Sequence, residues 1–408
     1  MDTNKDTASK KMLQEALMDN KDFLRERVRD FCQNLLEEEM EAHLGAKKYQ
    51  RINSRSGYRN GYKPRTIKTR VGTLNLAVPQ DRDGNFCPKL FDRYQRNEKA
   101  LVSAMMEAYL AGVSTRKVSK LTEALCGTSF SAATVSAITS TLDSQIKAWK
   151  VRKLNKAYPY LIVDATYIKV RIEDTVVSQG AIIAVGIDSC GYREILALEV
   201  ANSETYQAYD SLFRDLKARS LSGVRLIISD DHKGLKKAVD KHFQGAAWQR
   251  CNFHFIRNLL DTVPRSKRKY TYSDLKTIFS SSSKAEALAR SAEVTAKYEK
   301  SYPRFVEKLE AGILDGLSYM DFPIEHWSRI RTTNLVERLN AEIKRRTNVV
   351  RIFPNLASAE RLLCALAIEQ NEEWITGRKY LNMEYLKNYS HKEPCMVKDK
   401  DKVLVALT

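Results

Sequence analysis

The chain of 408 residues contains no run of 18 or more apolar residues, so the sequence predicts no membrane-spanning helix. Its first twenty residues are charged and polar and lack the apolar core of a signal peptide. The seven cysteines are scattered, which favours reduced thiols in a cytosol over a disulfide framework. Because 43% of the residues are apolar, global disorder is excluded. We therefore expect two or three folded domains in a cytosol.

Acidic residues are in deficit, with 50 Asp and Glu against 68 Lys and Arg, a net charge of +18. This excess favours a nucleic-acid partner and, far less, an anionic membrane. Residues 47–70 hold no acid at all, and three tyrosines are interleaved with their basic residues. We expect these basic side chains to neutralise DNA phosphates, the alternative being a solvated charged surface. They are Lys47, Lys48, Arg51, Arg55, Arg59, Lys63, Arg65, Lys68 and Arg70.

The first 150 residues predict helices and one hairpin. Apolar residues recur at helical spacing over 9–43, and Gly45 is a plausible stop. Residues 66–70 and 74–78 alternate around Gly72, which predicts a β-hairpin. Three helices follow over 99–149, capped by Ser114 or Thr115 and by Ser129 or Ser131. They suit either a DNA-reading helix-turn-helix, in which Arg116 and Lys117 would contact DNA, or an ordinary three-helix unit.

Beyond residue 154 the pattern becomes mixed α/β. Three β-rich runs joined by short turns predict a meander over 160–170, 176–187 and 193–200. A helix over 205–219, an apolar strand at 224–228, a helix from about Gly234 and a short strand at 248–251 follow. Residues 256–322 are helical in pattern, and 333–346 and 357–374 predict two further helices.

Three acidic residues stand out in this region. Asp164 lies within the first strand, Asp230 follows the strand at 224–228, and Glu337 lies early in a helix. A carboxylate in an apolar strand is costly without a partner, and a divalent cation is one such partner. Each also has an ordinary explanation: Asp164 could form a turn, Asp230 and Asp231 could cap a helix, and Glu337 could complete a capping box with Asn334.

Several motifs, in order, resemble bacterial insertion-sequence transposases of the Mutator-like group (the insertion sequence two-five-six family). The similarity covers about residues 40–375. Its distinctive segments are 57–62 (GYRNGY), 112–116 (GVSTR), 158–164 (YPYLIVD), 229–235 (SDDHKGL), 249–254 (QRCNFH), 332–340 (TTNLVERLN) and 353–354 (FP).

The resemblance implies a ribonuclease-H-like core with a DDE triad, and the matching positions are Asp164, Asp230 and Glu337. It also implies two Mg²⁺ or Mn²⁺ ions held by these carboxylates, with strand cleavage and strand transfer at the inverted repeats of a transposon. The second motif usually carries Gly after its Asp, whereas Asp231 follows Asp230 here. We take Asp230 as the ligand, with Asp231 as the alternative.

The predicted fold class is an α/β ribonuclease-H-like core with a mixed five-stranded sheet, interrupted by an all-α insertion and preceded by DNA-binding regions. The 107 residues between Asp230 and Glu337 are too many for one strand and one connection, so an inserted helical domain accounts for them. The predicted regions are 1–45 (helical, contributing dimer contacts or capping a domain), 46–98 (basic, with the hairpin), 99–153 (helix-turn-helix-like), 154–258 (core), 259–325 (insertion), 326–385 (core with the Glu helix) and 386–408 (polar tail).

Cys251 and His254 form half of a zinc-binding pattern, but no second pair lies at suitable spacing, so zinc is not expected. The family also carries this pair, which we interpret as structural or adjacent to the active site. A second basic cluster surrounds Glu337 and is expected to hold the DNA backbone near the cut: Arg338, Lys344, Arg345 and Arg346.

Three functions fit these observations. The first is a transposase acting on double-stranded element ends and target DNA, associated with the nucleoid. The second is a related nuclease or resolvase without strand transfer, and the third is a DNA-binding regulator without enzymatic activity. Because transposon ends come in pairs, the first predicts a homodimer or higher oligomer.

Overall fold

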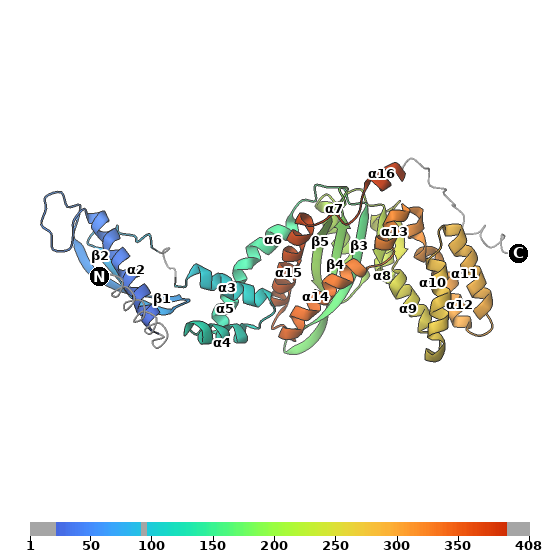
Figure 1. The fold of residues 1–408 in the computed structure, drawn as a ribbon, viewed down its shortest axis with the longest axis horizontal. Coiled ribbons are helices and arrows are strands. Elements are labelled where there is room, and N and C mark those ends of the chain that lie inside the picture. Colours follow the sequence, from blue (N-terminus) through green and yellow to red (C-terminus); the bar gives the residue numbers. More distant parts are fainter. Residues whose placement is uncertain (1–21, 91–95, 390–408) are drawn as a thin grey trace, which may run out of the picture. The chain divides into compact units, whose positions relative to one another are not determined.

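The computed structural model describes residues 22–90 and 96–389 of the chain, which divides into two compact units (Figure 1). The units are Met1–Thr141 and Leu142–Thr408. Of the described residues, no helix has both the length and the apolar character needed to cross a bilayer. The start of the predicted helix at 9–43 and most of the predicted polar tail at 386–408 lie outside the described residues.

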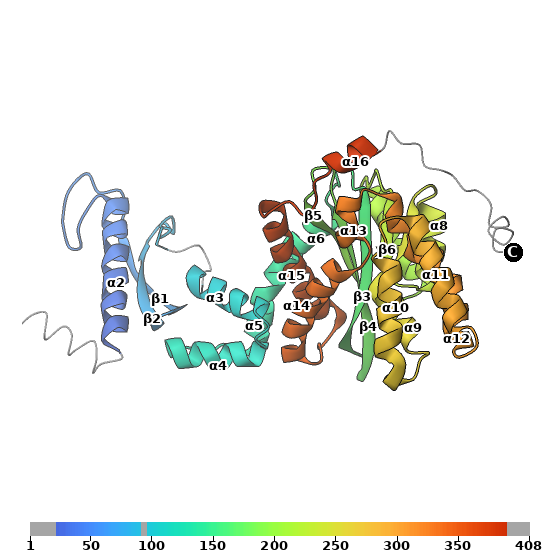
Figure 2. The same cartoon turned by 45° about the vertical axis from the view of Figure 1, so that its right-hand side comes forward.

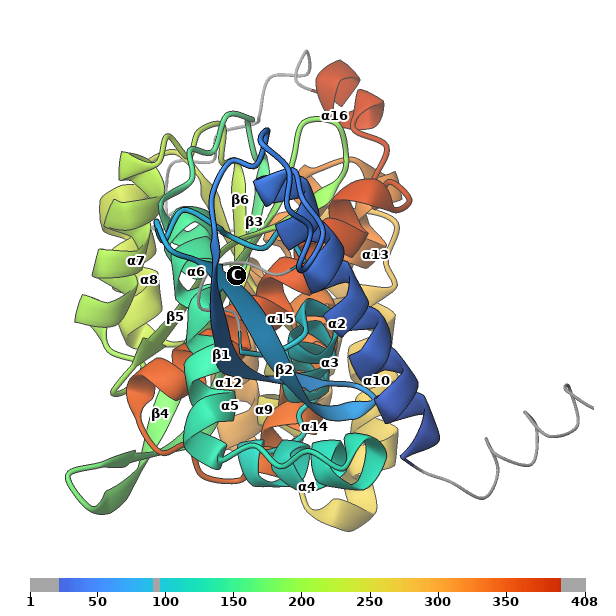
Figure 3. The ribbon, with the colours of Figure 1, turned by 90° about the vertical axis from the view of Figure 1, so that its left-hand side faces the viewer.

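The first unit opens with a long helix packed along a hairpin (Figure 3). Helix α2 (Phe23–Leu44) ends at Gly45, the stop that the sequence predicted, and its φ of +65° makes Gly45 a left-handed C-cap. Strands β1 (Arg59–Thr69) and β2 (Gly72–Asp81) pair antiparallel, which confirms the predicted hairpin. Leu36 of α2 is buried against alternate apolar residues of the hairpin, namely Ile67, Leu74 and Leu76.

Three helices complete the first unit: α3 (Lys99–Leu110), α4 (Thr115–Cys126) and α5 (Ala132–Thr139). Ser114 and Ser131 cap α4 and α5 by accepting backbone N–H bonds. The helix predicted to run to residue 149 is instead broken at Ser140–Leu142 by a turn of 3₁₀ helix, and α6 (Asp143–Val151) belongs to the second unit. Three consecutive hydroxyls, from Thr139 to Thr141, donate back to backbone carbonyls at the break and compete with regular helix bonding.

The second unit is built on a mixed five-stranded sheet in the order β5-β4-β3-β6-β7. The first three strands in sequence form the predicted antiparallel meander: β3 (Tyr160–Ile172), β4 (Thr175–Ile187) and β5 (Arg193–Ala201). Strands β6 (Leu226–Ser229) and β7 (Ala247–Arg250) then add in parallel next to β3. The end of β6 therefore lies beside the first residues of β3, where Ile228 pairs with Ile162, two residues before Asp164.

Helices cover both faces of this sheet. Helices α7 (Tyr206–Ala218) and α8 (Lys233–His242) cover one face, where Leu161 and Val163 of β3 enter their apolar cluster. Because side chains alternate along a strand, Asp164 points to the opposite face. That face carries α14 (Asn334–Val350) and α15 (Leu356–Thr376) (Figure 2).

The connection from β7 to α14 consists of helices joined by short loops. Most of it is a group of packed helices, α9 to α12, and a short helix, α13, leads into α14 (Figure 1). The bounds are α9 (Asn252–Leu260), α10 (Arg268–Phe279), α11 (Lys284–Tyr298), α12 (Pro303–Gly316) and α13 (Ile324–Ile330), with α16 (Glu384–Tyr389) after α15.

Candidate active site

Asp164 lies in the interior of β3 and not at a turn. It pairs in register with Ile183 of β4, and its side chain points toward α14. There Asn340 donates a hydrogen bond from Nδ2 to Asp164 Oδ2 at 2.8 Å. The first acidic residue is therefore a strand carboxylate tied to the helix that carries Glu337.

Asp230 and Asp231 follow the end of β6, and neither caps the next helix. His232 is the N-cap of α8, because its Nδ1 accepts a hydrogen bond from the Leu235 amide. The Asp231 carboxylate forms an ion pair with Arg250 at 3.0 Å, whereas the Asp230 carboxylate contacts His254. The two adjacent aspartates thus have different partners.

Glu337 lies in the first turn of α14, but the predicted capping box is not formed. Thr333 occupies the N-cap position, and Asn334 is already inside the helix. The Glu337 carboxylate instead lies 3.6 Å from Nε2 of His254 and 3.4 Å from the Thr333 hydroxyl. Its side chain is 31% exposed, so it faces neither the core nor open solvent.

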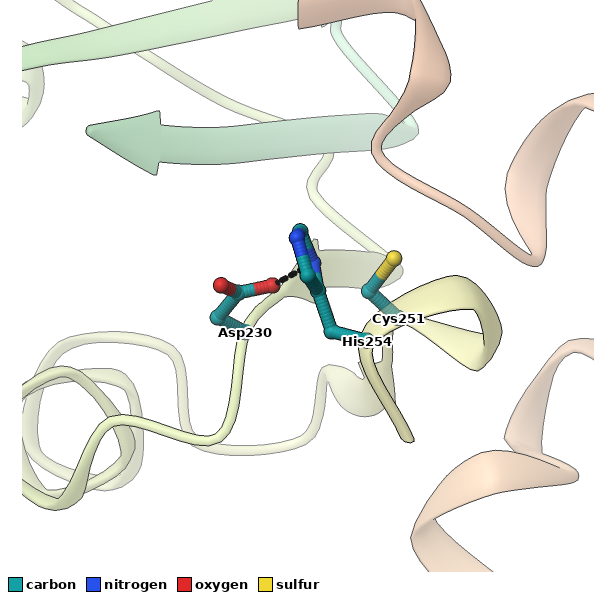
Figure 4. Close-up of side chains that lie close together, drawn as sticks. All are labelled: Asp230, Cys251 and His254. Atoms are coloured by element: carbon teal, nitrogen blue, oxygen red, sulfur yellow. Dashed lines mark ion pairs between the residues drawn. The ribbon is translucent and has the colours of Figure 1, made fainter. Parts of the chain in front are cut away.

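His254 joins these acidic groups. Figure 4 shows its ring between the Asp230 carboxylate and the Cys251 side chain. Nδ1 contacts Asp230 and Nε2 faces Glu337, so one imidazole spans carboxylates from two elements. The buried Cys251 sulfur accepts hydrogen bonds from the backbone amide and the hydroxyl of Thr333, at 3.4 and 3.3 Å. The Cys-x-x-His pattern therefore connects the start of α9 to the start of α14.

The carboxylates of Asp164, Asp230 and Glu337 lie close enough for their negative charges to repel one another. The pKa of Asp164 is raised to about 7, first by burial, then by the neighbouring Asp230 charge and, less, by that of Glu337. The pKa of His254 is raised to about 10, first by its hydrogen bond to Asp230 and then by that to Cys251. His254 is thus a cation at neutral pH and offsets part of the carboxylate charge.

The donor set suits a divalent cation. Asp164, Asp230 and Glu337 offer carboxylate oxygens, the donors that Mg²⁺ takes in proteins, and their shared repulsion is what a cation would relieve. Among the described residues, the group whose ligand atoms all lie within 4.8 Å of one another is a different one, namely Asp230, Cys251 and His254. In that second set the Cys251 sulfur already accepts two hydrogen bonds, and Asp230 already holds His254.

The match to known proteins covers nearly the whole chain. The family profile described as "Transposase, Mutator family" matches residues 1–377. The chain belongs to the Mutator family of transposases.

Relatives of this Mutator-family transposase share long stretches of sequence with it. The transposase for insertion sequence element ISRM5 of Rhizobium meliloti is 46% identical over 377 residues, which cover 92% of this chain and 95% of that protein. The transposase for IS256 in transposon Tn4001 of Staphylococcus aureus is 43% identical, covering 86% of this chain and 90% of that protein. A chain of the Drosophila P element transposase strand transfer complex aligns over 72% of this chain and 84% of that chain, with 11% identity and a TM-score of 0.31.

The basic residues of this transposase divide into paired and exposed groups. In the first unit Arg59 pairs with Glu37 at 2.5 Å and Arg70 with Glu98 at 2.9 Å. Acidic residues of α2 and of the segment before α3 therefore neutralise part of the positive charge of residues 47–70. Others in the unit are exposed, among them Lys47, Lys48, Arg51, Lys63, Arg116 and Lys117. In the second unit Arg345 and Arg346 pair with Glu342, whereas Arg338 and Lys344 are exposed.

Sequence reasoning missed three residues of the cluster: Thr333, Asn340 and Arg250. Asn340 follows Glu337 by three positions, which places both on adjoining parts of one helical surface and could have identified it. Thr333 and Arg250 lie within the segments that carry the family resemblance, but their contacts were not predictable, because their partners come from other elements.

Proposed function

We propose that this transposase cleaves DNA at the ends of its element and joins the freed ends to a second site, with Asp164, Asp230 and Glu337 as the carboxylates of the active site. The observation that carries the proposal is that the strand end with Asp230 and the helix with Glu337 meet at the ring of His254, while Asn340 of the same helix binds the strand carboxylate of Asp164. The Asp230 and Glu337 carboxylates face the two ring nitrogens of His254. The charges of Asp230, His254 and Glu337 all act on the Asp164 carboxyl group.

The sheet supports a ribonuclease-H-like core. The sequence predicted for this core a three-stranded meander, a helix, a fourth strand, a helix and a fifth strand, and the five strands form one mixed sheet in which β6 lies parallel beside β3. We assign the core to 154–258 and 326–385, with 259–325 as an all-α insertion. Helices α10, α11 and α12, which pack on one another, support this division.

Asp164, Asp230 and Glu337 would hold Mg²⁺ or Mn²⁺, two ions per site. When bound, such ions supply Lewis acidity: they activate the attacking oxygen and stabilise the leaving oxygen of a phosphodiester. The chain contributes the placement. Asn340 fixes the orientation of Asp164, and the imidazolium of His254 holds Asp230 and faces Glu337. Thr333 holds the first turn of α14 against Cys251.

Two displacements at phosphorus make up the reaction. In the first, a water oxygen bonds to phosphorus, its proton passes to solvent, and the bond from phosphorus to the 3′-oxygen breaks to leave a 3′-hydroxyl and a 5′-phosphate. In the second, that 3′-hydroxyl loses its proton to solvent as its oxygen bonds to the phosphorus of another phosphodiester, and the 3′-oxygen of the attacked strand leaves and takes up a proton. Both steps place charge on oxygens beside the carboxylate cluster.

DNA contacts come from both units in this proposal. The exposed basic residues of the first unit and α4–α5 would hold the element end, and Arg338 and Lys344 would hold backbone near the cut. We expect a homodimer or higher oligomer engaging two ends, in the bacterial cytoplasm in association with the nucleoid.

A labelled-substrate assay separates the candidate functions. Duplex element ends with labelled 3′-termini are incubated with Mg²⁺ and target DNA, and the products are sized. A transposase gives joined products, and Asp164→Asn, Asp230→Asn and Glu337→Gln each lose cleavage and joining while retaining DNA binding. Cleaved but unjoined DNA would indicate a nuclease or resolvase. Full biological activity of Asp164→Asn would indicate a DNA-binding regulator.

A further inference from the structure

Two arginines lie at the ring of one tyrosine in the second unit, Tyr380, and the charge of a third arginine acts on the same group. The guanidinium of Arg193, at the start of β5, lies 5.0 Å from the ring centre of Tyr380 and 4.9 Å from that of Trp374. Arg329 of α13 lies 5.2 Å from the same Tyr380 ring. Arg338, the residue after Glu337, adds its charge to the group. We call these five residues the arginine–aromatic cluster.

The cluster has cations without matching acids. Among the ion pairs formed by the described residues, none includes Arg193, Arg329 or Arg338, and the buried Nε of Arg193 has no hydrogen-bond partner there. Burial lowers the pKa of Arg193, and the charges of Arg329 and Arg338 lower it further, while Tyr380 opposes the fall. Arg193 and Arg329 are thus held together by aromatic rings, which attract guanidinium groups but do not neutralise them, and Arg338 adds a third like charge.

The surrounding backbone holds this arrangement in place. The amide of Tyr380 donates to the carbonyl of Gly191 at 2.7 Å, which fixes the segment after α15 against the turn between β4 and β5. Gly191 has a φ of +91°, and a Cβ there would lie 1.9 Å from the Leu381 carbonyl oxygen. The close approach requires glycine, so Tyr380 is seated by a specific contact and not by a loose loop.

We propose that the arginine–aromatic cluster binds a backbone phosphate of the DNA strand that enters the carboxylate site. Guanidinium groups donate in pairs to phosphate oxygens, and a phosphate would supply the negative charge that the three arginines lack. Arg338 directly follows Glu337 in α14, so a strand lying at the carboxylates passes the cluster within a few nucleotides. This inference rests on the proposed function and adds Arg193, Arg329, Trp374 and Tyr380 to the DNA contacts.

The test measures binding of duplex element ends by the full chain over a range of salt, in an Asp164→Asn background to prevent cleavage. Arg329→Gln and Arg338→Gln are compared with Arg290→Gln, which removes the same charge from α11, where Arg290 pairs with Glu286. Each cluster variant should reduce the slope of log affinity against log salt by about 0.9, whereas the control should not change it. Arg193→Lys is included as the variant that retains the positive charge at this position of the cluster. Thermal unfolding shows whether each variant is folded.

A second arm locates the phosphate. Single neutral methylphosphonates are placed one at a time along each strand near the cleavage position. One or two positions should weaken binding by the parent chain and have no effect on binding by Arg329→Gln. Equal salt slopes and unchanged interference patterns in folded cluster variants would overturn the inference, even where the parent binds and cleaves. A parent that neither binds nor cleaves element ends would instead defeat the proposed function.

Discussion

Asn340 donates a hydrogen bond to Asp164 across the space between α14 and β3, at 2.8 Å. Asn340 is 6% exposed, and its Oδ1 has no hydrogen-bond partner among the described residues. Glu337 lies one helical turn earlier on the same helix. The bond therefore fixes the strand carboxylate and the helix carboxylate relative to each other.

Replacing Asn340 by alanine should reduce strand cleavage more than DNA binding. A hydrogen bond to a charged group contributes about 1.5–3 kcal/mol, so the cleavage rate should fall about tenfold to a hundredfold. Single-turnover cleavage at saturating enzyme measures this directly. Asn348→Ala, an exposed asparagine on the same helix, is the control. An unchanged cleavage rate in folded Asn340→Ala would show that the bond does not position Asp164.

In the first unit, a groove of about 730 Å³ beside β1 is lined by four basic side chains and no acidic one: Lys63, Arg65, Lys68 and Arg96. Replacing Lys63 and Arg96 by glutamine should reduce the salt slope of DNA binding by about 1.8, because about 0.9 is lost for each phosphate contact. Removing Arg25 and Arg29 subtracts the same charge from α2, where they pair with Asp22 and Asp30. Equal slopes in the two double variants would contradict the assignment.

Alanine variants at Gly191 and Gly245 form a matched pair that tests the close backbone contact beside Tyr380. Both have a φ of +91°, but a Cβ at Gly245 would meet nothing within 4 Å, whereas one at Gly191 would meet the Leu381 carbonyl. Alanine at either position should lower the free energy of unfolding by about 1–3 kcal/mol through backbone strain. Gly191→Ala should lower it further. Urea unfolding of the two variants measures the difference in free energy of unfolding. Equal losses would show that the contact between a Cβ at position 191 and the Leu381 carbonyl does not lower stability.

Asp210 should stabilise the second unit only above acidic pH. Its buried carboxylate accepts from Lys241 at 2.7 Å and His242 at 2.9 Å, and it also pairs with Arg214. These bonds, that of Lys241 first, hold the pKa of Asp210 well below its ordinary 3.8. The folded state therefore binds this proton more weakly than the unfolded state, so the stabilisation is complete above about pH 4 and is lost as the pH falls below that value.

Thermal unfolding of Asp210→Asn across pH tests this sign. The variant should melt below the parent at pH 7, and the gap should narrow as the pH falls below 4. Asp240→Asn, on the exposed side of α8, should melt with the parent throughout. A gap that widens in acid would mean that Asp210 is stabilising in its protonated form.

Much of the fold could be predicted because its signals are local. The alternation in β1 and β2, the glycine after α2 and the apolar runs of β3 to β5 each lie within a few residues. The break between α5 and α6 was missed because apolar spacing continues through Ser140 while the neighbouring hydroxyls bond to the backbone. The spacing of apolar residues does not reveal that side-chain hydroxyls compete for the backbone hydrogen bonds of the helix.

The candidate site was predictable only in part. The acids Asp164, Asp230 and Glu337 stood out by their positions in apolar segments and by resemblance to a family. Their partners did not, because Asn340 meets Asp164 from 176 positions away and Thr333 meets Cys251 from 82. Contacts between distant segments depend on how the elements pack, and no local pattern in one sequence specifies that packing.

Metal rescue at Asp230 and Asp231 tests the central claim most directly. Each aspartate is replaced by cysteine, whose sulfur binds Mn²⁺ better than Mg²⁺, and cleavage of labelled element ends is measured with each ion. Asp230→Cys should be inactive with Mg²⁺ and recover with Mn²⁺, whereas Asp231→Cys, which loses only the pair with Arg250, should cleave with either ion. Mg²⁺-supported cleavage by Asp230→Cys at the parent rate would contradict the assignment of Asp230 as a metal-binding carboxylate.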